Sequence, residues 1–182
     1  MPYADIPDFI KRLDKQEGMA RWALEFLILT TTRTSEVINA EWSEIDFDRK
    51  LWTIPAIRMK AGKEHRVPLV KRSLDILETV KPFSHERYIF TAGKKDKPLS
   101  NMAMVMLLRR MGINDITVHG FRSTFRDYIA AETLHDYHTA EAALAHKLKD
   151  KVAAAYARSD LFDKRFRMMQ DWADYCVSKG IK

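Results

Sequence analysis

The chain has 182 residues, of which 46% are hydrophobic and 31% charged, a composition that excludes a disordered chain and suffices for one folded domain. Its 31 Lys and Arg residues against 25 Asp and Glu give a net charge of +6, which favours a polyanionic partner such as nucleic acid without identifying one. A single cysteine excludes an intramolecular disulfide and a cysteine-based zinc site, and the lack of a signal peptide or an apolar run of about 18 residues predicts a soluble, cytosolic protein.

The first half of the chain predicts two helices followed by a β-hairpin. Apolar residues at helical spacing predict a helix over 19–30, and a polar link, TTTRTS, leads into a second short helix over 35–42. Residues 51–55 and 65–69 mix β-branched residues with a proline and flank a turn at 61–63. We therefore expect two strands joined by a tip that is rich in basic residues.

The second half is mostly helical. The predicted elements are a helix over 71–80, a short strand and basic loop over 88–100, and helices over 101–112, 119–132 and 162–177. No repeat, linker or low-complexity segment divides the sequence. The fold class is therefore α+β and mainly helical, with a small antiparallel β-sheet or hairpin, in one domain over residues 1–182.

The strongest local signal is HGFR, because His119 and Arg122 share one face at the start of a predicted helix. Arg126 lies one turn further along the same face. A phosphate there would meet an imidazole, a guanidinium and the positive end of the helix. The alternative is that His119 caps the helix and Arg122 is a solvated surface charge.

Arg33 lies in the polar link TTTRTS, three residues before Glu36. It either forms an ion pair with Glu36 at a helix start or provides a second clamp on the same phosphate, because a guanidinium can grip two phosphate oxygens at once. Sequence separation alone leaves this choice open.

Four further residues could carry chemistry. Lys60 and Lys63 flank the hairpin turn, where an ammonium group could donate a proton to a leaving oxygen or simply be solvated. His146 follows an apolar run in LAHK, and Tyr156 lies ten residues later among alanines; packing is the ordinary role of both. The rival tyrosines are Tyr3, Tyr88, Tyr128, Tyr137 and Tyr175.

Other phosphate chemistries find no support in the sequence. It has no phosphate-binding loop of the G-x-x-x-x-G-K-[ST] type. The pair His135 and His138 is expected in a solvated loop rather than at a metal, and Asp46–Asp48 is expected to be a turn rather than a magnesium site. A phosphate chemistry without metal or cofactor remains.

Taken together, these pieces resemble the catalytic set of the tyrosine recombinases, the phage integrase family: Arg33, Lys60, His119, Arg122, His146 and Tyr156, in that order. The blocks WTIP, VPL, TVHGFRSTFRDY and AAAYARSDLFDKR look like those of prophage-type integrases. The resemblance covers essentially the whole chain, and it implies the catalytic fold of the DNA breaking and rejoining enzymes.

The resemblance also implies roles. Tyr156 would attack a DNA phosphodiester and form a 3′-phosphotyrosyl link, Lys60 would protonate the leaving 5′-oxygen, and His119 would take part in acid-base chemistry. The transition state would be stabilised by Arg33, Arg122 and His146. Glu36 would orient the Arg33 region, and contacts to DNA are expected from Lys63, Arg126 and Lys147.

For the whole protein, the resemblance implies integration or excision of a prophage-like mobile element at double-stranded DNA attachment sites. It implies a homotetramer on DNA, DNA-bending or excision factors as partners, and a nucleoid-associated place in the bacterial cytoplasm. Arm-binding and core-binding domains, expected ahead of such a catalytic domain, are absent from this sequence. The alternatives are a type IB topoisomerase-like DNA relaxation activity and a catalytically inactive DNA-binding module.

Overall fold

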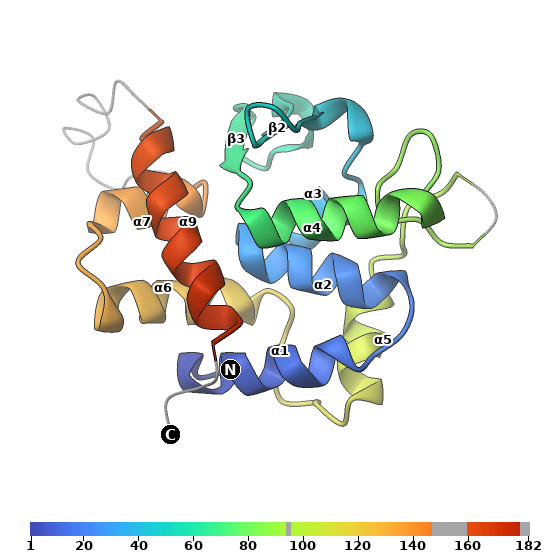
Figure 1. Ribbon diagram of the computed structural model, residues 1–182, viewed down its shortest axis with the longest axis horizontal. Helices are drawn as coiled ribbons and strands as arrows, with labels where there is room; N and C mark the ends of the chain where they lie inside the picture. The colour runs from blue at the N-terminus through green and yellow to red at the C-terminus, as the bar shows by residue number, and fades with distance from the viewer. Residues whose placement is uncertain (94–95, 147–159, 179–182) are drawn as a thin grey trace.

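The computed structural model describes residues 1–93, 96–146 and 160–178. Its helices and strands follow one another along the chain as Figure 1 shows. The α-helices are α1 (Ile6–Asp14), α2 (Met19–Thr30), α3 (Thr34–Ile38), α4 (Lys71–Val80), α5 (Ala103–Arg110), α6 (Gly120–Glu132), α7 (Tyr137–Ala143) and α9 (Phe162–Cys176). The strands are β1 (Ile45–Asp46), β2 (Leu51–Ile54) and β3 (His65–Pro68), and the short 3-10 helices include η2 (Trp42–Glu44) and η3 (Ala56–Arg58).

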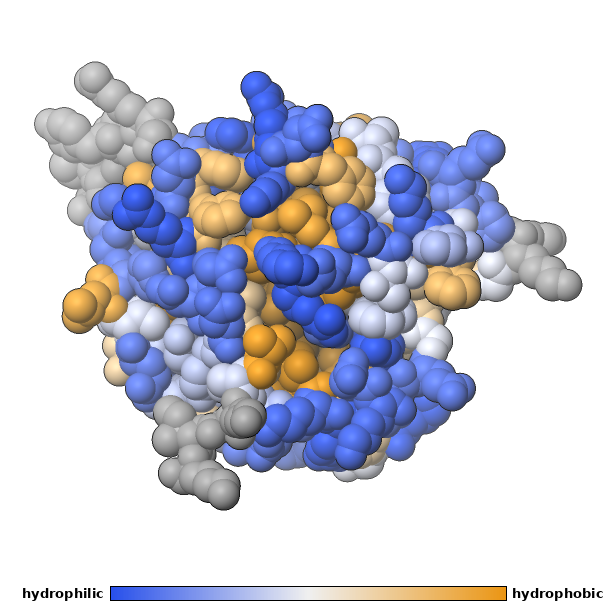
Figure 2. Space-filling model, in the orientation of Figure 1, coloured by the Kyte–Doolittle hydropathy of each residue, from blue (hydrophilic) through white to orange (hydrophobic). Residues whose placement is uncertain are grey.

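Helix α2 is the centre of the fold. Every residue from Ala23 to Thr30 is buried, including Glu25, which pairs with Arg21 and Arg72. It packs against α1, α3, α4, α5, α6 and α9. Hydrophilic residues cover most of the face in Figure 2, and hydrophobic ones gather near its middle. The C-terminal end of α2, which leads into Arg33, is therefore fixed from several sides.

The sheet is antiparallel with the order β1-β2-β3, and β2 pairs with β3 from Leu51 opposite Pro68 to Ile54 opposite His65. Trp52 of β2 is buried and packs against Phe26 of α2, with 5.4 Å between the ring centroids. The predicted hairpin is confirmed, but its connection is longer than a simple turn because it contains η3. Lys60 follows η3 in that connection.

Two predictions of secondary structure were wrong in extent. The helix expected over 35–42 ends at Ile38, because Glu41 forms a β-bridge with Tyr88 and the Trp42 amide donates to the Arg87 carbonyl at 3.0 Å. The strand expected within 88–100 is present only as isolated bridges in the residues described there. Tertiary pairing thus replaced the helical pattern after Ile38.

Two helices were missed. Helix α1 buries Ile6, Phe9, Ile10 and Leu13 on one face. Helix α7 begins at Tyr137, inside the stretch 135–138 that was expected to be a solvated loop, and its N-cap Asp136 accepts hydrogen bonds from the amide and hydroxyl of Thr139 at 2.9 and 2.8 Å. Within the described parts of the chain, none of the helices has the length and apolar character needed to cross a membrane.

Candidate active site

Arg122, in the first turn of α6, is buried with 4% of its surface exposed. Its guanidinium donates to the carbonyl of Thr31 and, at 2.5 Å, to the carbonyl of Leu144. These carbonyls lie at the C-terminal ends of α2 and α7, where the helix dipole favours a positive charge. Arg122 is therefore not the solvated surface charge of the alternative hypothesis.

The chain has an unusual backbone at both places that Arg122 holds. Thr31 and Ala145, which follows Leu144, have positive φ values of 53° and 47°. Such values are uncommon for residues other than glycine and persist where surrounding contacts hold them. The Arg122 Nε atom is buried without a hydrogen-bond partner in the described residues. The side chain thus fixes two turns and keeps one donor uncommitted.

Arg33 is the N-cap of α3 and forms the ion pair that the sequence suggested. Its Nη1 lies 2.9 Å from Oε1 of the buried Glu36, and its backbone amide donates to Oε2 at 2.7 Å. Burial and then the charge of Arg33 lower the pKa of Arg122 to about 10, while Glu36 and Glu141 act in the opposite direction. Arg33 therefore pairs with Glu36 and also lies close enough to Arg122 to lower its pKa, so the two alternatives for Arg33 are compatible.

His146 is the third member of this network. Its Nε2 lies 3.2 Å from Arg122 Nη2, and its Nδ1 lies 3.1 Å from Glu141 Oε2. Because a guanidinium can only donate, Nε2 is the acceptor and Nδ1 carries a proton toward Glu141. Arg126 Nε lies 3.6 Å from the other oxygen of Glu141. Arg126, expected to contact DNA, is therefore also tied to the site through Glu141.

His119 lies immediately before α6 and is exposed. Its side chain makes no capping hydrogen bond, so the capping alternative was wrong. Partial loss of solvent around the ring lowers the pKa of His119 first, and Arg122, Arg33, His146 and Lys60 then lower it further. His119 thus lies within electrostatic reach of four other predicted site residues.

Lys60 is exposed and lies in the turn after η3, and Lys63 is exposed in the same connection. The connection is attached to the site by Arg58, which donates to the carbonyls of Glu36 at 3.2 Å and Asn39 at 2.7 Å. Lys60 therefore emerges from a loop that is held to the helix carrying Glu36.

The remaining two predicted residues, Lys147 and Tyr156, lie outside the described residues. The described chain ends beside the site at His146 and resumes at Asp160, four positions after Tyr156.

The sequence did not identify His65, the first residue of β3. Burial and then Arg165 lower its pKa to about 4; the charges of Arg122 and Arg33 act in the same direction, and a hydrogen bond with the Ala143 backbone opposes them. Alternation along HRVPL places His65 on the buried side with Val67, and this was a usable signal. Glu141 gave no such signal, because its contact with His146 depends on how the chain turns after the end of α7.

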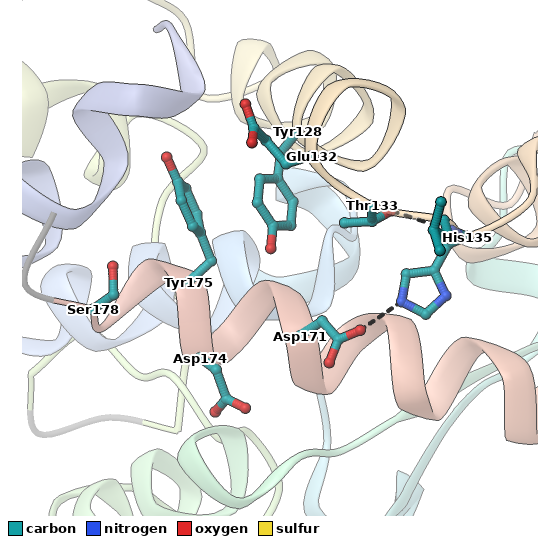
Figure 3. Close-up of a pocket in the computed structure, with 9 residues that line it drawn as sticks. Tyr128, Glu132, Thr133, His135, Asp171, Asp174, Tyr175 and Ser178 are labelled. Carbon is teal, nitrogen blue, oxygen red and sulfur yellow. Dashed lines mark hydrogen bonds and ion pairs between the residues drawn. The ribbon is translucent and has the colours of Figure 1, made fainter. Parts of the chain in front are cut away.

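A separate pocket of about 650 Å³ lies between α6 and α9 (Figure 3). Its lining includes Tyr128, Glu132 and Tyr175, and His135 Nε2 there lies 2.7 Å from Asp171 Oδ2. No predicted site residue lines it. Among the residues that the structure describes, no group of three or more histidine, cysteine or acidic side chains is arranged to hold a metal ion.

Solved structures with the same fold support the predicted fold class. An integrase from mycobacterium phage Brujita matches with a TM-score of 0.65 at 15% identity, over 88% of this chain and 54% of that one. A lambda integrase dimer bound to a COC′ core site matches with a TM-score of 0.60 at 20% identity, over 87% and 46% of the two chains. The mainly helical α+β fold with a small antiparallel sheet is therefore confirmed.

Sequence relatives agree with this. Prophage integrase IntA of Escherichia coli strain K12 is 42% identical over 154 residues, which are 81% of this chain and 36% of that protein. The integrase of Enterobacteria phage P4 is 34% identical over an alignment of 195 positions, gaps included, which covers 96% of this chain and 44% of that protein. The chain thus spans less than half the length of either relative. Residues 2–161 match the sequence model of the phage integrase family. The chain belongs to the phage integrase family.

Proposed function

We propose that this chain is the catalytic domain of a site-specific DNA recombinase that cleaves and rejoins DNA through Tyr156. The observation that carries the proposal is the convergence of charge at one place. Arg33, Arg122, His146 and Lys60 all act on the pKa of His119, although these residues are spread over more than half of the chain. Such a cluster, in which Arg33, Arg122 and Lys60 are the cations, suits a phosphodiester whose charge grows during reaction.

The phosphate would lie against Arg33 and Arg122. Arg122 is held rigid by two carbonyls, while Arg33 is aimed by Glu36 and is partly exposed. Rigid donors need little reorganisation as charge develops, which is how such sites stabilise a five-coordinate phosphorus. His146 would be the third contact of this phosphate, because its Nε2 lies 3.2 Å from Arg122 Nη2.

The cleavage step would proceed by in-line displacement. The Tyr156 hydroxyl oxygen forms a bond to phosphorus as the bond from phosphorus to the 5′-oxygen breaks. Lys60 gives a proton to the leaving 5′-oxygen, and His119 takes the phenol proton. Because the pKa of His119 is lowered, its imidazole is neutral at pH 7 and can accept that proton. Attack by a 5′-hydroxyl on the phosphotyrosine reverses the step, and a hydroxyl from another strand completes strand exchange.

The partner proposed is double-stranded DNA containing an attachment site, which agrees with the core site named for the lambda integrase structure. Lys63 and Lys147 would contact the DNA backbone, and Arg126 would do so while paired with Glu141. The full protein would act as a homotetramer in the bacterial cytoplasm at the nucleoid, with DNA-bending or excision factors. It would integrate or excise a mobile element such as a prophage.

The test is covalent trapping on a nicked duplex that carries the attachment site of the encoding element. Wild type is expected to give a covalent protein–DNA band and Tyr156→Phe none. Tyr88→Phe also removes one tyrosine hydroxyl, at the residue that forms a β-bridge with Glu41, and it should keep the band. Arg33→Gln and Arg122→Gln should slow its formation about 100-fold or more.

Two results would contradict the proposal. A band from Tyr156→Phe would show that another residue is the nucleophile, and no band from wild type would favour an inactive DNA-binding module. Relaxation of supercoiled plasmid without exchange between paired sites would favour the topoisomerase-like alternative.

A further inference from the structure

Arg165 of α9 is a buried cation that the proposed chemistry does not use, with 1% of its surface exposed. Each side of its guanidinium is occupied. Nε donates to the Asp160 carbonyl at 2.6 Å, Nη1 donates to the Arg66 carbonyl of β3 at 2.5 Å, and Nη2 lies 3.0 Å from Asp160 Oδ2. Arg165 therefore joins three segments: α9, β3 and the residue at which the described chain resumes.

A second arginine reaches the same carboxylate from β3. Arg66 Nη1 lies 3.0 Å from Asp160 Oδ2, and its guanidinium carbon lies 4.7 Å from the centre of the Phe162 ring. The other oxygen of Asp160 accepts a hydrogen bond from the Phe162 amide at 3.2 Å. We refer to Arg66, Asp160, Phe162 and Arg165 as the Asp160 clamp.

The clamp holds a backbone turn that would otherwise be unfavourable. Leu161 has a φ of 55°, a left-handed conformation that is rare for a leucine. A half-exposed pair such as Arg66 with Asp160 contributes little by itself. The buried Arg165 is different, since removing the Asp160 carboxylate would leave an interior charge held by backbone carbonyls alone. The clamp is therefore stronger than an ordinary surface ion pair.

The clamp also lies near the arginines of the candidate active site. His65 precedes Arg66 in β3, and Arg165, Arg122 and Arg33 all lower the pKa of His65. β3 follows directly after the loop that carries Lys60. One short strand thus connects the clamp, the Lys60 loop and the surroundings of Arg122.

We propose that Asp160 is a positioning residue for the cleavage step, because its clamp fixes the point from which the chain runs back to Tyr156. The inference rests on the proposed function of Tyr156 as the nucleophile. Four residues can span at most about 14 Å, so a shift of Asp160 moves the range that the phenol can reach. Arg33 and Arg122 hold the phosphate from other elements, so DNA binding is independent of the clamp.

The experiment compares Asp160→Ala with wild type in single-turnover cleavage of the nicked duplex at saturating DNA. The covalent complex should form about 10- to 100-fold more slowly, because small misplacements of a reacting group have effects of this size. The Kd for DNA should not change. Asp75→Ala, which removes the partner of the exposed Lys71 on α4, is the matched control and should cleave like wild type.

Two further measurements distinguish a positioning role of Asp160 from a purely structural one. Reactions are run well below the melting temperature of each variant, and the rate of rejoining from the covalent complex should fall together with cleavage. The double variant Arg66→Ala with Asp160→Ala should lose less than the sum of the two single losses, because both changes break the ion pair between Arg66 and Asp160. If Asp160→Ala does not fold, Arg66→Gln removes the ion pair with Asp160 and the contact with the Phe162 ring but keeps the contacts of Arg165, and it should slow cleavage in the same direction.

The inference is overturned if these variants cleave at the wild-type rate, or if weaker DNA binding accounts for the whole loss. Tyr156→Phe in the same gel separates this failure from that of the proposed function. A covalent band from Tyr156→Phe would overturn the nucleophile assignment. No band from Tyr156→Phe together with full activity of Asp160→Ala would overturn only the role of the clamp.

Discussion

At the residue scale, Arg122 shows why a guanidinium is needed at this position. Two of its nitrogens bind the carbonyls of Thr31 and Leu144, and Nε is left over. A lysine could satisfy neither two separated carbonyls nor a further acceptor in a fixed plane. Arg122 therefore links the folding of the site to its chemistry, since the nitrogens that hold the turns also orient the remaining donor.

His65 makes a prediction about pH. Its folded pKa of about 4 lies below the value of about 6.5 for an unfolded histidine, so the unfolded state binds more protons between these two values. The free energy of unfolding should therefore fall as the pH is lowered through this window. Between pH 7 and pH 5 this one group should account for a loss of about 2 kcal/mol. Urea unfolding at the two pH values measures it.

The control for this prediction is a comparison of two histidine variants. His65→Gln should flatten the dependence on pH, whatever it does to stability at pH 7. His138→Gln, at an exposed position of α7, should leave the wild-type slope unchanged. If His65→Gln retains the full slope, the titrating group lies elsewhere.

At the scale of elements, Arg58 attaches the Lys60 loop to α3 and η2. Besides the two α3 carbonyls, it pairs with Glu44, whose Oε2 also accepts from Trp52 Nε1 at 2.9 Å. Arg58→Ala removes all of these bonds and leaves Glu44 without its cation. We expect the free energy of unfolding to fall by about 2–3 kcal/mol in denaturant titration. Covalent complex formation should also slow, because Lys60 lies two residues away.

Arg49 supplies the control for that change. It lies in the turn between β1 and β2, its side chain is 79% exposed, and its Nε is 4.0 Å from Asp46. Arg49→Ala should change the free energy of unfolding by less than about 0.5 kcal/mol. Equal effects of the two substitutions would contradict the anchoring role of Arg58.

The same scale shows what sequence patterns could predict. Helices such as α2 and α4 follow from apolar spacing, because the pattern itself is what the core requires. Helix α7 was missed because it has only seven residues, and its start depends on a side-chain cap. For the site, the spacing of His119 and Arg122 is local. The bond from Arg122 to Thr31 spans 91 positions and arises only when α2 and α6 pack together.

At the scale of the whole molecule, the net charge of +6 predicts DNA affinity that falls steeply with salt, because bound phosphates release their counterions. Net charge alone does not say which face binds. In Figure 1 the sheet that flanks the Lys60 loop lies on the opposite side of the molecule from α1. Because the two regions lie on opposite sides, two substitutions that change the net charge equally can test which face binds DNA.

Lys63→Gln and Lys15→Gln lower the net charge equally, at the hairpin connection and just after α1. Both lysines are exposed. If the hairpin contacts the DNA backbone, Lys63→Gln should reduce the slope of log K against log salt by about 1, while Lys15→Gln leaves it unchanged. Fluorescence anisotropy over a salt series measures both slopes. Equal slopes would mean that the affinity arises from overall charge, and the hairpin would then lose its proposed place at the DNA.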